Sequence, residues 1–154
     1  MLKKYFLIPF VFTFFISCNQ SAVLDKFYKL AEDNRWLKSE VKTFEFSITD
    51  ESLEYDMIIQ FSHVYDYQYN SVPLKVILEN PSGEKKAITV DLKIKDNTGK
   101  QLAECSGDIC DLEQKILEKT KFSKGNYKVS ISQEFKGSYL PNVLGVGLIV
   151  EKSK

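Results

Sequence analysis

Apolar and polar residues alternate one by one along most of this chain, and the alternation restricts its fold more than any other feature. Every second residue is apolar over residues 44–48, 53–61, 72–78, 88–94 and 127–131, with Ile58 and Ile77 as extra apolar residues. A period of two places successive side chains on opposite faces of an extended strand. Each segment is therefore predicted to be a strand with one buried face, in a mainly β protein.

Turn signals separate these predicted strands. Asn80-Pro81-Ser82-Gly83 and Asp96-Asn97-Thr98-Gly99 contain residue types that suit tight turns, which predicts a meander of hairpins. Residues 143–150 are apolar at both parities, so they are predicted to form a central strand, with Gly145 and Gly147 allowing a neighbour to approach closely. About seven to eight short strands separated by turns predict an antiparallel β-sandwich.

Two segments are predicted to be helical. Asp111 suits the N-cap of one short internal helix, with Leu112 and Ile116 on one face. Residues 18–40 are predicted to be a tether or a short helix that leads to the domain, because four apolar residues share one helical face. Those residues are Leu24, Phe27, Tyr28 and Ala31. A single β-sandwich domain is then predicted over residues 41–152.

The first 18 residues have the three parts of a secretory signal. Two lysines precede an apolar stretch over residues 5–16, and Ser17 is a small residue directly before Cys18. The stretch is too short to cross a bilayer, which needs about 20 helical residues. A cysteine directly after the cut resembles the lipobox of bacterial lipoproteins, in which the thiol is acylated. We therefore expect a lipoprotein signal peptide at residues 1–17 and a lipid on Cys18; an ordinary signal peptide with a chance cysteine, or an uncut anchor, is the alternative.

Composition narrows the classes of partner. Without residues 1–17, the chain has 137 residues with 19 basic and 21 acidic side chains, which suits one domain with one core. Nucleic acid is not an expected partner, because its binding needs a clustered basic surface. No basic patch follows Cys18 either, so a lipid rather than charge would attach the protein to a membrane.

Cys105 and Cys110 leave three alternatives open. An exported chain could join them in a disulfide, they could remain two buried thiols, or they could take part in metal or redox chemistry. Their spacing is not the two-residue spacing of thioredoxin-like sites. Structural zinc takes four ligands, and the distant His63 would supply only a third. We expect no metal site and no cofactor apart from the lipid on Cys18.

Signatures of catalysis are mostly absent from the sequence. His63 is the single histidine and shares the parity of Phe61 at the end of a predicted strand, where a structural role is the expected one. Gly145 and Gly147 lie inside an apolar run with no helix after it, so they do not suit a phosphate-binding loop. The serines show no nucleophile elbow. We therefore expect neither enzyme activity nor a small-molecule substrate.

Four aromatic residues form the candidate interaction surface. Tyr65, Tyr67 and Tyr69 share one parity, so their rings could continue the core side of the preceding strand or stack on sugar faces as a glycan-binding platform. Trp36 could cap the base of the sandwich or act as an exposed interface anchor.

Several motifs follow one another in an order that resembles the gliding-motility lipoprotein family of the GldH type, found in Bacteroidetes-like bacteria. The resemblance covers residues 44–151 and begins after the lipobox-like cysteine. The motifs that carry it are Phe44-Glu45-Phe46-Ser47-Ile48-Thr49-Asp50, Tyr67-Gln68-Tyr69-Asn70, Asn80-Pro81-Ser82-Gly83, Gly125-Asn126-Tyr127 and Leu140-Pro141-Asn142-Val143.

The resemblance implies a lipoprotein of the cell envelope, anchored in the outer membrane and facing the periplasm. It also implies a structural or assembly role in the gliding machinery and its associated secretion system, through contact with other lipoproteins of that machinery. No catalytic residue is carried over, because the family is not defined by one. The residues alone leave an alternative, a glycan-binding surface or periplasmic lipoprotein that uses Tyr65, Tyr67 and Tyr69.

Overall fold

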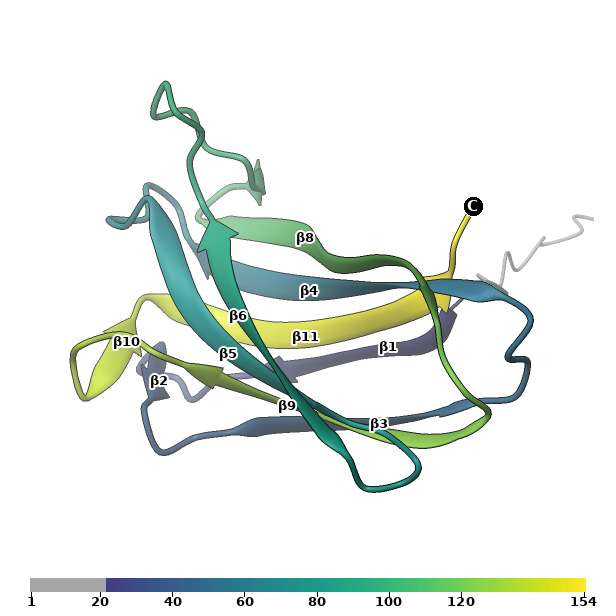
Figure 1. Ribbon diagram of the computed structural model, residues 1–154. Helices are drawn as coiled ribbons and strands as arrows, with labels where there is room; N and C mark the ends of the chain where they lie inside the picture. The colour runs from purple at the N-terminus through teal and green to yellow at the C-terminus, as the bar shows by residue number, and fades with distance from the viewer. Residues whose placement is uncertain (1–21) are drawn as a thin grey trace, which may run out of the picture.

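The computed structural model describes residues 22–154, and these residues form an antiparallel β-sandwich (Figure 1). Eight strands are long and three are short, which confirms the predicted fold class. The strands are β1 (Ala22–Lys29), β2 (Arg35–Leu37), β3 (Lys42–Ile48), β4 (Glu54–Val64), β5 (Ser71–Glu79), β6 (Lys85–Lys93), β7 (Glu104–Ser106), β8 (Ile109–Lys121), β9 (Gly125–Gln133), β10 (Tyr139–Pro141) and β11 (Val143–Lys152). No helix in residues 22–154 is long and apolar enough to cross a membrane.

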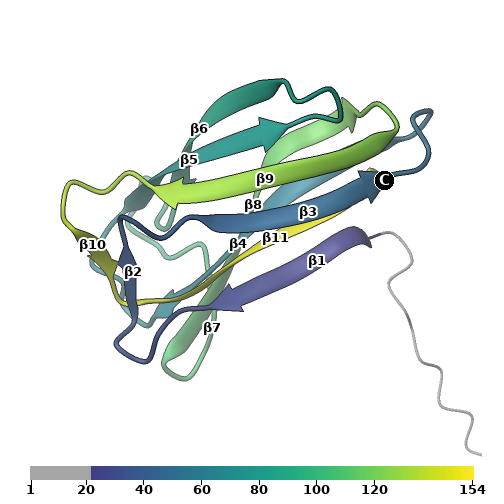
Figure 2. The same ribbon diagram turned by 90° about the horizontal axis from the view of Figure 1, so that it is seen from below.

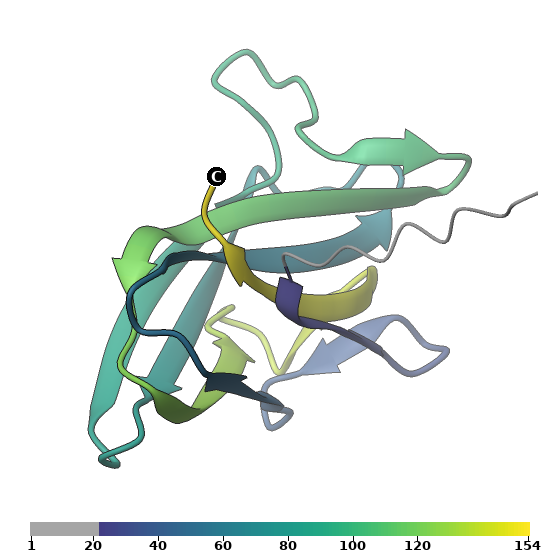
Figure 3. The ribbon, with the colours of Figure 1, turned by 90° about the vertical axis from the view of Figure 1, so that its right-hand side faces the viewer.

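Two main sheets make up the sandwich. The five-stranded sheet has the order β1-β11-β4-β8-β7 and the four-stranded sheet the order β3-β9-β5-β6, while β10 pairs with β2 in a small third sheet. The short strands β2, β10 and β7 lie toward one end of the molecule (Figure 2). β1 begins and the chain terminates at the opposite end (Figure 3). The long strands therefore run between an end that carries the short strands and an end that carries the start of β1 and the C-terminus.

The core lies between the two sheets and follows the predicted alternation. In β3, Phe44, Phe46 and Ile48 are buried, whereas Glu45 and Ser47 are exposed. The facing strands contribute their own alternate residues, and the two sheets bury one continuous apolar cluster. Removing this apolar surface from water is the main favourable term in forming such a domain.

The predicted meander of hairpins is wrong. Among β3 to β6, only β5 and β6 pair with each other, across the turn between Asn80 and Glu84. β3 pairs with β9, and β4 pairs with β11 and β8. Alternation identifies the buried face of a strand but not its neighbour, because both sheets bury the same kinds of side chain.

The predicted internal helix is also wrong, because residues 109–121 form strand β8. β8 pairs with β4 from Ile109, opposite Val64, to Lys121, opposite Glu54. Leu112 and Ile116 are four residues apart, and this spacing puts two side chains on one face of a helix or of a strand. Pairing with the mostly buried β4 favours the strand.

The prediction of a tether or short helix over residues 18–40 is wrong for the part that the structure describes. Residues 22–29 form β1, which pairs with β11 at the edge of the five-stranded sheet, and residues 35–37 form β2. The Tyr28 hydroxyl donates to the Thr43 carbonyl oxygen at 2.9 Å and so connects β1 to the other sheet. The sandwich therefore includes residues before 41, the predicted start of the domain. The predicted signal peptide and Cys18 lie outside the described residues.

Phe27 on β1 lies over two glycines of β11. A Cβ added to Gly145 would lie 2.2 Å from Phe27 Cζ, and one added to Gly147 would lie 2.8 Å from Phe27 Cδ2. The close approach predicted for these glycines is thus confirmed. β11 is an interior strand between β1 and β4, as expected from its apolar sequence.

Asp56 on β4 is a buried carboxylate held by three donors. Lys115 Nζ donates to Asp56 Oδ2 at 2.8 Å, the Lys119 backbone N–H donates to Oδ1 at 2.9 Å, and the Ser153 hydroxyl donates to Oδ1 as well. The bonds from Lys115 and Ser153 lower the pKa of Asp56 from 3.8 to about 2, against the opposing effect of burial. Asp56 therefore ties β8 and the end of the chain to β4.

The lowered pKa of Asp56 predicts a pH-dependent contribution to stability. The ionised carboxylate stabilises the fold above the unfolded pKa, and this contribution is lost as pH falls through the folded pKa. Asp56→Asn should lower the free energy of unfolding by about 2 kcal/mol at pH 7, and the difference should vanish as the pH falls from about 4 to about 2. Urea unfolding of both proteins at several pH values measures this difference in the free energy of unfolding. Asp25→Asn, the same change at an exposed aspartate of β1, is the control. If Asp56→Asn lowered the free energy of unfolding equally at every pH, the stabilising role of the ionised Asp56 carboxylate would be contradicted.

The contact between Phe27 and Gly145 predicts a specific steric coupling. Gly145→Ala should lower the free energy of unfolding by about 1–3 kcal/mol, because the new methyl group overlaps the ring. In a Phe27→Ala background the same substitution should cost clearly less, because the ring is gone. Unfolding of the four proteins in this double-mutant cycle measures the coupling. An equal cost in both backgrounds would show that the ring does not lie over Gly145.

Candidate functional site

The hairpin of β7 and β8 is closed by a disulfide. Cys105 and Cys110 lie opposite each other in the strand register, and their sulfurs are bonded. The Cys110 side chain is buried, whereas Cys105 is exposed. Of the three alternatives for these cysteines, the disulfide is the one that the structure contains. It holds the short edge strand β7 beside β8.

The three tyrosines do not form a common platform. Tyr67 is fully buried and its hydroxyl donates to the Pro141 carbonyl oxygen at 3.1 Å, while Tyr65 is 62% exposed and Tyr69 is half-buried. The rings of Tyr67 and Tyr69 meet edge to face, with 75° between their planes. The alternative of a glycan-binding platform is therefore wrong. β4 ends at Val64 and Asp66 has a positive φ of 53°, so the parity of the strand does not continue through the tyrosines.

Trp36 belongs to the core at the end that carries β2 and β10. Its side chain is fully buried, and its indole Nε1 donates to the Glu40 carbonyl oxygen at 2.9 Å. The Gln133 amide donates to the Trp36 carbonyl oxygen at 3.4 Å. Trp36 therefore caps the sandwich, and its alternative role as an exposed interface anchor is wrong.

His63 is enclosed by the core and not presented to solvent. Its side chain is fully buried, and its ring centroid lies 4.8 Å from that of Tyr67. Burial lowers the pKa of His63, and its Nδ1 lies 2.8 Å from the Val64 carbonyl oxygen. A neutral imidazole can donate Nδ1–H to that oxygen. The arrangement supports the structural role expected from the sequence.

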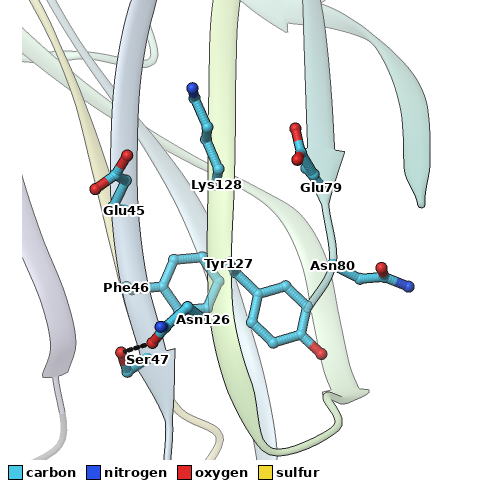
Figure 4. A pocket seen from close by; sticks show the side chains of 8 residues that line it. All are labelled: Glu45, Phe46, Ser47, Glu79, Asn80, Asn126, Tyr127 and Lys128. Carbon is cyan, nitrogen blue, oxygen red and sulfur yellow. Dashed lines mark hydrogen bonds between the residues drawn. The ribbon is translucent and has the colours of Figure 1, made fainter. Parts of the chain in front are cut away.

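The outer face of the four-stranded sheet carries charges that alternate in sign from strand to strand. Glu45, Lys128, Glu79 and Lys85 lie in one register row across β3, β9, β5 and β6. Figure 4 shows Lys128 between the two glutamates, beside a shallow hollow of about 430 Å³. Lys85 forms an ion pair with Glu79 at 3.5 Å. Each charge in the row has an opposite charge beside it in the register.

The outer face of the five-stranded sheet carries a different feature, which we name the Phe27–Leu102 groove. It consists of two hollows that share Asp111 and Glu113. The hollow of about 540 Å³ reaches Leu102 and Glu104, and the one of about 330 Å³ reaches Phe27 across β4. The groove therefore has an exposed apolar side chain at each end and carboxylates between them.

The carboxylates of the groove are not neutralised by basic side chains. Glu104 lies directly opposite Asp111 across β7 and β8. Asp111 accepts a hydrogen bond from the Ser62 hydroxyl, and Glu113 accepts one from Gln60 Nε2 at 3.2 Å. Within residues 22–154, Glu104, Asp111 and Glu113 form no ion pair. Like charges directly opposite each other in a sheet are destabilising, so the fold does not account for this arrangement.

The amino-acid sequence alone does not reveal this groove. Phe27 lies on the edge strand β1, and Leu102 lies two residues before β7, the strand at the opposite edge of the five-stranded sheet. The segment around Asp111 was predicted as a helix, which would not place Asp111 opposite Glu104. The pair Gly145 and Gly147 was the one sequence signal near the groove, because it indicated a close neighbour.

Comparison with known proteins gives the family. The GldH lipoprotein family matches residues 23–150, which run from β1 to β11. The gliding motility lipoprotein GldH of Flavobacterium johnsoniae is 29% identical over 122 residues, which cover 79% of this chain and 75% of the relative. The resemblance noted from the sequence motifs is confirmed by these matches. This chain belongs to the GldH lipoprotein family.

Proposed function

We propose that this lipoprotein is a structural or assembly component of the machinery for gliding motility and of the secretion system associated with it. The family match carries the proposal, because it spans nearly all of the described sandwich and the Flavobacterium johnsoniae relative is a gliding motility lipoprotein. A role in binding rather than catalysis is supported by the single histidine, which is fully buried and out of reach of a substrate.

We propose that Cys18 carries the lipid and holds the sandwich close to the membrane. Three residues separate Cys18 from Ala22, where β1 begins. Four steps between consecutive Cα atoms span at most about 14 Å. The end of the sandwich where β1 begins would then lie next to the bilayer, and β2, β10 and β7 would lie away from it (Figure 2).

We place this anchor in the outer membrane, with the sandwich on its periplasmic side and other lipoproteins of the machinery as its partners. The disulfide between Cys105 and Cys110 supports an exported location, because such bonds persist in oxidising compartments. The lipid would act as the membrane attachment and the sandwich as the part that makes protein contacts. Multiple acyl chains would make the attachment lasting, because one chain alone holds a protein only marginally.

The proposed function predicts the phenotype of two strains. Deleting the gene should abolish colony spreading and reduce secretion through the associated system. A copy with Cys18→Ala should fail to restore either property and should lack incorporated radiolabelled fatty acid, whereas the wild-type copy should restore both. Cys105→Ser serves as the matched cysteine control and should still incorporate the label. A deletion strain that glides and secretes normally would contradict the role, and a Cys18→Ala protein that is still acylated would contradict the anchor.

A further inference from the structure

We propose that the Phe27–Leu102 groove docks a basic, extended segment of a partner protein. The proposal rests on the proposed function, because it names the contact through which a membrane-anchored component would engage its machinery. The groove is on the outer face of the five-stranded sheet, and its defining residues are Phe27, Leu102, Glu104, Asp111 and Glu113.

The shape of the groove suits an extended segment. It runs across the sheet from β1 to β7, which are separated by four strand spacings or about 19 Å. That distance matches about six residues of extended chain. Phe27 is 39% exposed and Leu102 is 48% exposed, so each end offers an apolar side chain to an occupant.

The charge of the groove indicates a basic occupant. Within residues 22–154, no ion pair is formed by the three carboxylates Glu104, Asp111 and Glu113. Glu104 and Asp111 lie directly opposite each other on the neighbouring strands β7 and β8. Lysine or arginine side chains of a partner would remove this repulsion and form charge-assisted hydrogen bonds. The row on the four-stranded sheet has opposite charges beside each other and contains no such like-charge pair.

The same charges disfavour the other occupants. A second copy of this groove would bring carboxylates opposite carboxylates, which is repulsive at an interface. An anionic membrane surface would also be repelled, because it attracts basic rather than acidic segments. A basic protein segment is therefore the occupant that the groove favours.

The position of the groove leaves it accessible when the protein is anchored. The register row that contains Asp111 and Glu104 begins at Lys29 on β1. Lys29 is seven residues, or about 23 Å, along β1 from Ala22, which is at the end proposed to lie next to the bilayer. The disulfide of Cys105 and Cys110 keeps Glu104 beside Asp111 before any partner arrives. A groove that is ordered in advance lowers the entropy cost of binding.

Glu104→Lys separates docking from folding. The new lysine would lie opposite Asp111 and remove a like-charge pair, so the melting temperature should stay the same or rise. It would also place a positive charge where the basic segment binds, so docking should be lost. Glu118→Lys, the same change at an exposed position near the other end of β8, is the matched control.

The test uses a photo-crosslinking amino acid at position 102 of the full-length lipoprotein, in living cells of a strain that depends on it for gliding. We expect an adduct with another protein, through a peptide that contains lysine or arginine. The adduct should fall at least tenfold with Glu104→Lys and stay unchanged with Glu118→Lys. The proposal is overturned if no adduct forms, or if the adduct persists with Glu104→Lys. It is also overturned if the crosslinked peptide contains no basic residue, or if the crosslinked molecule is lipid or a second copy of this protein.

Gliding and secretion measured in the same strains separate this proposal from the proposed function. If the wild-type copy restores both properties but no adduct forms, the groove proposal fails and the proposed function stands. If the adduct forms as expected but the deletion strain glides and secretes normally, the groove proposal stands and the proposed function fails.

Discussion

The pairing of β1 with β11 is the constraint on which the rest of this structure depends. It makes β11 an interior strand of the five-stranded sheet and places the Phe27 ring over Gly145 and Gly147. It also brings Tyr28 to the edge of the other sheet, where its hydroxyl bonds to Thr43. Because only three residues separate Cys18 from the start of β1, the same pairing determines how far the sandwich could stand from a lipid on that cysteine.

The two outer faces of the sandwich differ because strand order brings different residues together. On the four-stranded sheet, each acidic side chain in the row through Lys128 has a basic neighbour. On the five-stranded sheet, Glu104 and Asp111 face each other and the apolar ring of Phe27 remains partly exposed. Both faces are solvated, but the second carries like charges opposite each other, together with exposed apolar side chains. This difference makes the five-stranded sheet the better candidate for protein contacts.

Much of the fold could be predicted from residues that alternate, because one buried face leaves a period of two in the sequence. The prediction failed where apolar residues stand four apart, as in Leu112 and Ile116 or in Leu24 and Tyr28, because that spacing fits a helix and a strand equally well. Strand neighbours were not predictable, since either sheet could bury the same side chains. The groove depends on those neighbours, so it could not be predicted from single residues or local motifs.

The most direct test of the pairing between β1 and β11 is amide hydrogen exchange of β1 in the full-length protein. If β1 pairs with β11, alternate amides of residues 24–29 should be protected by hydrogen bonds and should exchange only when the strand opens. We expect their exchange to be slowed by orders of magnitude relative to an unstructured chain. Exchange of all these amides at the unprotected rate would show that residues 22–29 are a tether. That result would contradict the strand pairing and the proposed close approach of the sandwich to the membrane.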